Sequence, residues 1–466
     1  MLTALLLAAF ALQQFHAEIP LSGLGDPLST GKSFGLAYEP QSDRIFVAVC
    51  GDLPFVGTPN RTIAVIDPAT DTVIGEISCG IFPEEIAFAY DPLTGALQYG
   101  ACSNSQSGTV TIWNAALAVV ATVALPDRLG FGTCFPFGLA ATDTHLFVTT
   151  QDGSGDVYAI SLATLALDPA ASHNVGAGRL GARCAVVSGA LWIADSLGLP
   201  AFSGSEGGFL SLDLTTGTAA SWLVARDDSY VLYPAGQDLA PLSVGGAWLA
   251  GTDLGGRLWR VDADGALNRA LDLGGRSVYG LAADSSGGLI AACTLFGGEV
   301  LLVDARAERL LSETAVGALG AGGHAQPNDA VFAHDKLFVT CQGSESLLVF
   351  DQLPSAGPPP AWSGALIVSA TTPDPGASVT ATVISPSGGA CWLLGSDSCA
   401  DSAIAGLDLR LGPNPRVHLA GTGQISRAVS VPSGAGVTGR AWFLQGVVQD
   451  SGALFLATTP RAVVVQ

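Results

Sequence analysis

The sequence predicts an all-β protein, built from a seven-bladed β-propeller that an N-terminal strand closes and a small C-terminal β-sandwich. Three observations support this prediction. A strand-like phrase returns seven times between residues 44 and 341. The composition combines 59 Gly and 26 Pro with 13% charged and 48% hydrophobic residues, which suits many short strands joined by tight turns. No long helical heptads interrupt this pattern.

The repeated phrase is the second strand of each predicted blade. Its seven versions are RIFVAV, ALQYGA, HLFVTT, ALWIAD, AWLAGT, GLIAAC and KLFVTC. The second residues of these phrases lie between 41 and 57 positions apart, at Ile45, Leu97, Leu146, Leu191, Trp248, Leu289 and Leu337. A period of about 50 residues with several strands in each unit is typical of propeller blades rather than of a solenoid.

Each unit contains four predicted strands. A first strand such as FGLAY precedes the repeated phrase, and a third strand such as TIAVID leads through a tight turn to a fourth such as VIGEIS. Several of these strands alternate apolar and polar positions, as half-buried strands do. The seventh unit breaks off after Leu353 without a fourth strand. Residues 18–21 precede the first unit in the place of such a strand, so we expect them to close the ring.

Residues 1–17 predict a signal peptide in front of the propeller at 18–354. The apolar stretch is too short to span a bilayer. Cleavage after Ala11 or after Ala17 fits small residues at the cut, and a buried first strand or a misassigned start is the alternative. No later segment is apolar for long enough to form a transmembrane segment. We therefore expect a secreted, periplasmic or cell-surface protein.

The chain changes character after the last repeat. The Pro-rich stretch 355–363 predicts a semi-rigid linker. Residues 364–466 then alternate β-branched runs with Gly and Pro turns, which indicates a C-terminal β-sandwich module of about eight short strands.

Nine cysteines without a C-x-x-C pair argue against zinc ribbons and thioredoxin-type chemistry. Cys391 and Cys399 are the only pair in the C-terminal module, so a local disulfide is expected between them. Cys184 begins a first strand and is expected to be a buried free thiol. Clasps between neighbouring blades are expected from cysteines that fall toward one face, namely Cys50, Cys79, Cys102, Cys134, Cys293 and Cys341.

The segment IAVIDPATDTVIGEISCGIFPEEIAFAYDP resembles the YVTN-type repeat of bacterial surface and secreted β-propellers. In that repeat a VID-x-x-T-x-x-V strand pair is followed by G-x-x-P-x-x-(I/V)-A. The resemblance covers roughly residues 18–353, and the fourth and fifth units lack the matching Pro. The C-terminal phrases LDLRLGP and GRAWFLQGVV are similar to modules of planctomycete-type secreted proteins. The resemblance implies an exported bacterial propeller and names no activity, because propellers serve many functions.

Residues just before the first strands are expected to converge around the central channel, where ligands would bind. One group offers oxygen and nitrogen ligands to a single divalent cation such as calcium: Glu85, Asn328 and Asp329, with His324 beside them. A second group would instead clamp an anionic ligand: Lys32, Arg183 and Arg276. A purely structural role of these polar residues in lining the channel is the alternative, and no cofactor is required.

Charge and missing motifs narrow the class of function. The formal net charge of −21 repels phosphate backbones, so nucleic acid is not an expected partner. The sequence has no G-x-S-x-G, H-E-x-x-H, P-loop, EF-hand or C-x-x-C-H motif. These observations favour a protein that is not an enzyme.

Three functions remain from the sequence. The favoured one is a secreted or surface-associated binding scaffold, whose propeller face recognises a protein, a glycan or a small ligand. The first alternative is a metal-assisted lactonase-like or lyase-like enzyme that uses the channel mouth. The second alternative is a structural component of the cell envelope.

Overall fold

In a computed structural model, the chain forms two compact units at residues 1–356 and 357–466. The first unit is described for residues 14–351 apart from 53–55, 196–207, 223–234, 242–246, 253–256, 262–266, 274–275, 285–287 and 305–308. The second unit is described only in its strands, which lie between residues 365 and 464.

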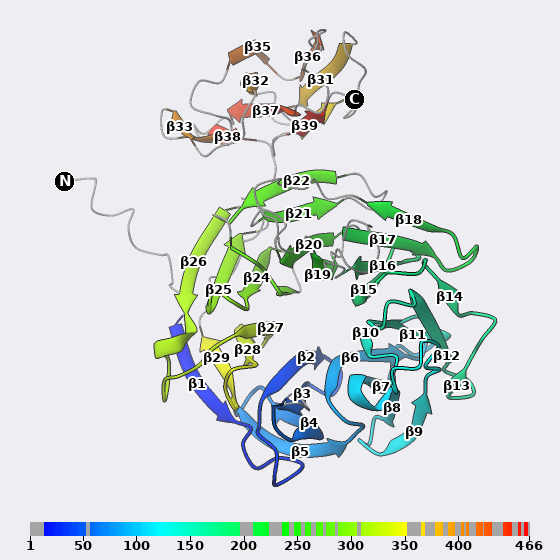
Figure 1. The fold of residues 1–466 in the computed structure, drawn as a ribbon. Helices are drawn as coiled ribbons and strands as arrows, with labels where there is room; N and C mark the ends of the chain where they lie inside the picture. The colour runs from blue at the N-terminus through cyan, green and yellow to red at the C-terminus, as the bar shows by residue number, and fades with distance from the viewer. Residues whose placement is uncertain are drawn as a thin grey trace. The chain divides into compact units, whose positions relative to one another are not determined.

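The first unit is a seven-bladed β-propeller, as predicted. Its sheets follow one another around a ring, and the first strand of each blade lies nearest the centre (Figure 1). The first three blades are β2 (Ser33–Glu39), β3 (Arg44–Gly51), β4 (Pro59–Asp67) and β5 (Thr72–Ser78); β6 (Pro83–Tyr90), β7 (Leu97–Asn104), β8 (Thr109–Asn114) and β9 (Val119–Ala124); and β10 (Pro136–Ala141), β11 (His145–Thr150) and β12 (Asp156–Ser161) with the short outer strands β13 (Ala166–Leu167) and β14 (His173–Asn174).

The remaining blades repeat the same antiparallel order. They are β15 (Gly181–Val187), β16 (Ala190–Asp195), β17 (Gly208–Asp213) and β18 (Ala219–Trp222); β19 (Ala235–Pro241), β20 (Ala247–Thr252), β21 (Arg257–Val261) and β22 (Leu267–Asp272); β23 (Gly280–Ala283), β24 (Leu289–Thr294), β25 (Glu299–Asp304) and β26 (Arg309–Ala315); and β27 (Pro327–Ala333), β28 (Lys336–Cys341) and β29 (Ser346–Asp351) with β1 (Gln14–Pro20). Two short 3-10 turns, η1 (Ser105–Ser107) and η2 (Val316–Ala318), complete the elements.

The N-terminal strand closes the ring, which confirms the prediction from the incomplete seventh unit. β1 pairs antiparallel with β29, with Ile19 opposite Leu347. Ile19 is buried, and the ring of Phe15 packs edge-on against that of Phe350. The strand already begins at Gln14, so the predicted signal-peptide boundary at residue 17 falls inside β1.

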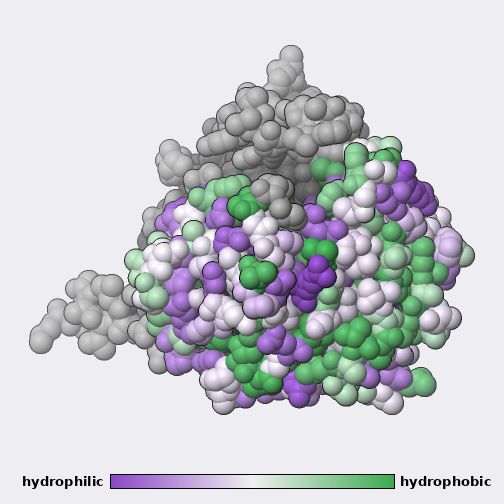
Figure 2. All heavy atoms as spheres, turned by 60° about the horizontal axis from the view of Figure 1, so that its bottom comes forward, coloured by the Kyte–Doolittle hydropathy of each residue, from purple (hydrophilic) through white to green (hydrophobic). Residues whose placement is uncertain are grey.

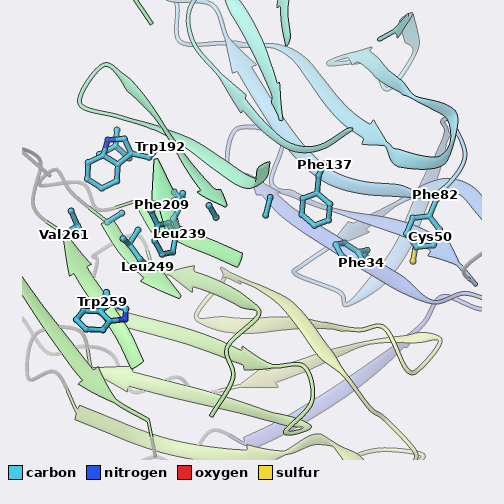
Figure 3. Close-up of a cluster of buried hydrophobic side chains, with 14 residues drawn as sticks. Phe34, Cys50, Phe82, Phe137, Trp192, Phe209, Leu239, Leu249, Trp259 and Val261 are labelled. Atoms are coloured by element: carbon cyan, nitrogen blue, oxygen red, sulfur yellow. The ribbon is translucent and has the colours of Figure 1, made fainter. Parts of the chain in front are cut away.

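A separate apolar cluster fills each junction between neighbouring blades. The closing junction is typical: residues of β1, such as Ile19, pack with Val47 of blade 1 and Phe338 of blade 7. The cluster of blades 4 and 5, with Trp192, Leu249 and Trp259, is continuous with aromatic residues near the channel (Figure 3). Burying apolar surface between blades is the main force that holds the ring together.

The predicted clasps between blades are wrong for the part of the chain that the structure describes. All seven cysteines there, from Cys50 to Cys341, are free, as predicted for Cys184 alone. The register differs between blades: Cys102 lies opposite Ile86, whereas Cys293 lies opposite Gly280, which corresponds to Glu85, one residue nearer the start of the first strand. Such a step turns a side chain to the other side of its sheet. The predicted Cys391–Cys399 bridge lies outside the described residues, because residues 397–400 do not belong to them.

The C-terminal unit is also all-β. One sheet has the order β30-β31-β36, a second has the order β35-β32-β37-β38 with β39 beside β37, and β33 pairs with β34. The bounds are β30 (Ala365–Val368), β31 (Ser378–Ile384), β32 (Ala390–Ser396), β33 (Ser402–Ile404), β34 (Leu407–Leu409), β35 (Arg416–Thr422), β36 (Gln424–Ser430), β37 (Ala441–Gln449), β38 (Phe455–Ala457) and β39 (Arg461–Val464). Among the described residues, no helix has the length and apolar character of a membrane span.

Candidate functional site at the central channel

Seven equivalent residues of the first strands surround the central channel. Each one lies directly before the first-strand residue that pairs with the middle of the second strand. In blade 1 that pairing residue is Leu36, opposite Val47, and in blade 7 it is Ala330, opposite Val339. We call these the channel positions; in blade order they are Gly35, Glu85, Gly138, Arg183, Asp238, Gly280 and Asp329. Four of the seven blades therefore present an ionisable side chain at one level, and three present none.

The three glycines are required by close approach of the blades. A Cβ atom on Gly35 would collide with the carbonyl oxygen of Glu84 in the next blade. Gly138 and Gly280 meet backbone oxygens of their following blades in the same way. These contacts bring the first strands of adjacent blades together, and they leave the channel to the four charged side chains.

We expect Gly35→Ala to destabilise the propeller by about 1–3 kcal/mol, because an added methyl group forces the two strands apart. Gly75→Ala on the outer strand β5 is the matched control, since its nearest neighbour is Val65 Cβ at 4.0 Å. Chemical denaturation of both variants measures the difference. Equal stability of Gly35→Ala and the wild type would contradict the close approach.

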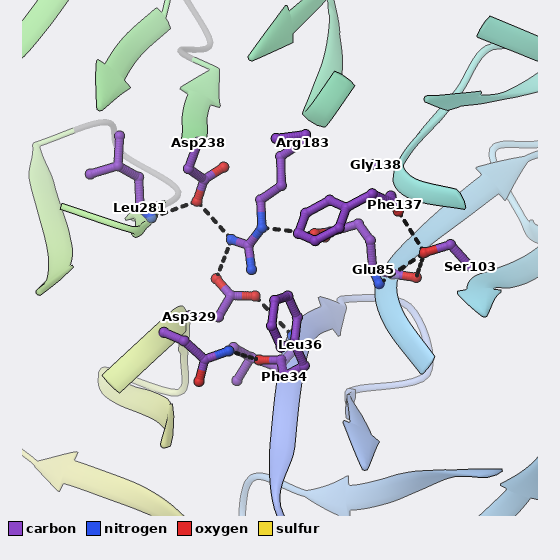
Figure 4. A network of polar contacts seen from close by, with 12 residues as sticks. Phe34, Leu36, Glu85, Ser103, Phe137, Gly138, Arg183, Asp238, Leu281 and Asp329 are labelled. Carbon is purple, nitrogen blue, oxygen red and sulfur yellow. Dashed lines mark hydrogen bonds and ion pairs between the residues drawn. The ribbon is translucent and has the colours of Figure 1, made fainter. Parts of the chain in front are cut away.

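Arg183 lies at the centre of a network that joins four blades (Figure 4). Its Nη1 atom donates to Asp238 Oδ2 and to Asp329 Oδ1, both at 2.7 Å, and its Nε atom lies 2.8 Å from Glu85 Oε2. The side chain of Arg183 is only 7% exposed. One buried guanidinium thus lies among three carboxylates, from blades 2, 5 and 7.

The two aspartates also accept backbone hydrogen bonds from neighbouring blades. Asp329 Oδ2 accepts from the N–H of Leu36 at 2.9 Å, and Asp238 Oδ2 accepts from the N–H of Leu281 at 2.6 Å. In both cases the next blade has glycine at its channel position, so its backbone is accessible to the carboxylate. The network therefore fixes strand positions as well as charge.

Hydroxyl groups tie further pairs of blades at the same level. Ser103 Oγ donates to the carbonyl oxygen of Phe137 at 2.5 Å, and Thr149 Oγ1 donates to that of Ala182 at 2.6 Å. Thr340 Oγ1 donates to the carbonyl oxygen of Phe34 at 2.7 Å. Because these bonds are buried and cross between blades, they make the wall of the channel rigid.

Burial keeps part of the network protonated near neutral pH. Removal from water raises the pKa of Glu85 to about 8, against the opposing effect of Arg183. The same cause raises the pKa of Glu84 to about 8 and that of Asp238 to about 6. Burial also lowers the pKa of Arg183, but the surrounding carboxylates outweigh this and hold it well above its ordinary value. One cation cannot support full ionisation of several buried acids, so protons balance the remaining charge.

Aromatic rings lie beside the charged network, one residue closer to the start of the first strands. The ring of Phe34 packs edge-on against Phe137 and Tyr279, with centroids 5.6 and 6.1 Å away. Phe34 and Phe137 are each 4% exposed. Three blades thus contribute rings to one layer. This layer lies between the level of Arg183 and the face of the propeller at which the first strands begin.

No protein-family model matches the chain, and no curated protein sequence matches it. Among solved structures, a chain of hydrazine synthase from Kuenenia stuttgartiensis is similar with a TM-score of 0.49 and 12% sequence identity. The likeness covers 71% of this chain and 97% of that chain. It carries no argument about function.

The structure brings only part of the predicted site together. Glu85, Arg183 and Asp329 meet in the channel, whereas Asn328 turns to donate a hydrogen bond from Nδ2 to Phe34 O at 2.7 Å. Among the described residues, no group of three or more His, Cys, Asp or Glu side chains is arranged to hold a metal ion. Arg183 lies between the carboxylates that were expected to bind a cation.

The other predicted basic residues lie elsewhere and share a different role. Lys32 pairs with Asp52 at 2.6 Å, and Arg276 pairs with Glu299 at 2.8 Å. In each case the basic residue precedes the first strand of a blade, and the acid lies in or at the edge of the loop that joins the second and third strands of the same blade. The pairs Arg128–Asp156 and Arg179–Asp195 repeat this arrangement. They connect the two kinds of loop within four blades.

His324 secures the closing strand rather than the channel. Its buried ring has Nε2 3.5 Å from Glu18 Oε2 on β1. Glu18 also accepts hydrogen bonds from Ser346 Oγ at 2.5 Å and from the N–H of Ala321 at 3.0 Å. These bonds, with Ser346 contributing most, hold the pKa of Glu18 below its ordinary value.

Asp238 belongs to the network, and the charge of Arg183 acts on the buried Glu84, although the predicted site left both residues out. Asp238 shares the channel position with Glu85 and Asp329, so an alignment of the first strands would have found it. Glu84 is 6% exposed and lies one residue before the channel position. Its only signal in the sequence is its neighbour Glu85.

Proposed function

We propose that the protein is a binding scaffold, which recognises a protein partner through one face of the propeller. This loop face carries the loops that follow the outer strands and those between second and third strands; the opposite hairpin face carries the other turns. Five large apolar side chains on the loop face are exposed by 49–83%, namely Leu28, Val56, Leu129, Phe131 and Phe296. On the hairpin face, Leu93 is the one such residue in the described part of the chain. The exposed large apolar side chains of the loops therefore lie mostly on the loop face, which makes it the candidate interaction surface.

The loop that presents Phe131 is fixed in advance of binding. The carboxylate of Asp127 accepts hydrogen bonds from the N–H groups of Gly130 at 2.8 Å, Phe131 at 3.2 Å and Gly132 at 2.6 Å. Gly130 and Gly132 have φ angles of 76° and 89°, which glycine adopts without strain. A loop ordered in the free protein loses little conformational entropy on binding, so Phe131 is suited to anchor a partner.

The network around Arg183 supports a scaffold better than an enzyme. The guanidinium lies among the carboxylates that a metal-assisted lactonase or lyase would use to hold its metal ion, and the network is buried. Hydrogen bonds and ion pairs at the channel connect neighbouring and opposite blades. These features give the loop face a rigid support.

Export is part of this proposal. Its support is the predicted signal peptide and the resemblance to YVTN-type secreted and surface propellers. The C-terminal unit at residues 357–466 would then serve in attachment or sorting. The second candidate function is a structural component of the cell envelope. The signal peptide, the resemblance and the C-terminal unit fit this function equally well, but it needs no dedicated binding partner.

The test is a screen of the full chain against a displayed peptide library, followed by affinity measurement on each hit. We expect Phe131→Ser combined with Phe296→Ser to weaken binding by tenfold or more, which corresponds to about 1.4 kcal/mol. Leu93→Ser is the matched control, because Leu93 is 93% exposed on the hairpin face and should leave affinity unchanged. Equal losses in both variants, or none in the double variant, would refute the assignment of the loop face.

A further inference from the structure

The last three strands of blade 2 form an uncharged sector in a strongly acidic protein. Residues 92–126 contain no Asp, Glu, Lys, Arg or His, although the whole chain has a formal net charge of −21. This stretch includes β7, β8 and the outer strand β9. Two copies of the chain that approach each other repel over most of their surface, and this sector is where the repulsion is weakest.

The outer strand of this sector is an open edge with apolar side chains. β9 is the last strand in the order β6-β7-β8-β9. Val119 and Val120 are 45% and 42% exposed, and Thr122 and Ala124 are exposed as well. On the surface seen in Figure 2, hydrophobic residues gather in patches between hydrophilic ones. An apolar edge strand without charges is a template for pairing with another strand.

The outer strands of the other blades are protected by charge or by length. Charged or ionisable residues occur in the outer strands of four blades: Glu76 in β5, Arg269 and Asp272 in β22, Arg309 and Glu313 in β26, and His16 and Glu18 in β1. β13 and β14 have two residues each, and β18 has four. β9, with six residues and no charge, is the exception.

The register within blade 2 shows which part of β9 is regular. Ile112 lies opposite Ala121 and Trp113 lies opposite Val119, so Val120 is the extra residue of a bulge. Thr122, Val123 and Ala124 continue opposite Thr111, Val110 and Thr109 without interruption. The regular end offers backbone groups to a further strand, and the bulged end adds the two exposed valines.

We propose that two copies of the chain associate through antiparallel pairing of β9 with β9 of the second copy. Antiparallel pairing of identical strands obeys two-fold symmetry, so each copy contributes the same surface and the interface closes as a dimer. The valines of one copy meet apolar residues of the other, and no charge of β7, β8 or β9 has to be desolvated. This surface is the rim of blade 2, separate from the loop face of the proposed function.

Salt should strengthen this association. Raising NaCl from about 0.1 M to about 1 M shortens the Debye length from about 10 Å to about 3 Å, which screens the repulsion between the acidic copies. Sedimentation velocity of the full chain over a concentration series measures the dimer fraction. We expect a monomer–dimer equilibrium that shifts toward dimer with added salt. A monomer at every concentration and salt level would overturn the proposal.

Charged substitutions locate the interface. Val120→Lys and Val120→Glu each bring one charge from every copy into the apolar interface, where it must be desolvated, and we expect each to lower the association constant by about tenfold or more. Ile74→Lys and Ile74→Glu are matched controls, because Ile74 is 51% exposed on the outer strand of blade 1 and gives the same change in net charge. The controls should leave the dimer intact. A dimer that survives both Val120 variants, or that the Ile74 variants disrupt equally, would refute pairing through β9.

Discussion

Replacing Arg183 by methionine is expected to destabilise the propeller by about 3–5 kcal/mol at neutral pH, the cost of removing one partner from a buried ion network. The variant retains the apolar stem, but Glu85, Asp238 and Asp329 then lie in the channel without their cation. Three acids at one level repel each other when they are charged, and water cannot solvate them there. Chemical denaturation followed by tryptophan fluorescence measures the loss.

Two comparisons separate the effect of the network from a general loss of charge. Lys32→Met removes the partner of Asp52, and Arg276→Met removes the partner of Glu299 and Glu313; these ion pairs are partly exposed, so each variant should cost no more than about 1 kcal/mol. The cost of Arg183→Met should be smaller at about pH 5 than at about pH 8, because protonation relieves the repulsion among the acids. A cost that does not change with pH would show that Arg183 stabilises the channel by packing alone.

The ring of blades is readable in the sequence because its second strands are buried on both faces. Ile45, Leu146 and Leu337, at one end of the repeated phrase, have no exposed surface. Such strands must be apolar throughout, and seven of them leave a clear period. The closing strand is readable for a related reason, since the seventh unit lacks a fourth strand and β1 supplies it.

The sequence does not predict which charged side chains form ion pairs inside the channel. Glu85, Arg183, Asp238 and Asp329 come from four blades, and their separation along the chain carries no information about distance. The sequence alone does not distinguish a metal ion from a guanidinium as the cation among these carboxylates. An alignment of the first strands would have helped, because Arg183 is the one basic residue among the seven channel positions.

Lys32 and Arg276 were expected at the channel because they lie just before first strands, and the structure does not place them there. Both lie near the beginning of a first strand, as predicted, yet each bonds to an acid of its own blade. They precede the channel position by three and four residues, so they belong to the rim of the channel and not to its wall. A long basic side chain in a loop reaches an acid of its own blade more easily than an acid across the channel.

The stability of the propeller is expected to fall as pH rises from about 5 to about 8. The buried carboxyls of Glu84 and Glu85 have folded-state pKa values of about 8, against an ordinary value of 4.5. The folded state therefore retains protons that the unfolded state releases in this range. The stabilising contribution is complete below pH 4.5 and is lost as pH approaches 8. Each group contributes a slope of up to about 1.4 kcal/mol per pH unit.

Glu84→Gln and Glu85→Gln should flatten this dependence, because an amide does not titrate. Each variant should match the wild type most closely at about pH 5 and exceed its stability at about pH 8. Asp213→Asn is the control: hydrogen bonds from the N–H groups of Thr216 and Thr215 hold the pKa of Asp213 below 3.8, outside this range. Denaturation midpoints of the wild type and each variant, measured at about pH 5, 6.5 and 8, give the pH dependence of stability that is compared. If the glutamine variants keep the wild-type slope, the protons lie elsewhere, and the channel carboxylates are fully ionised around Arg183.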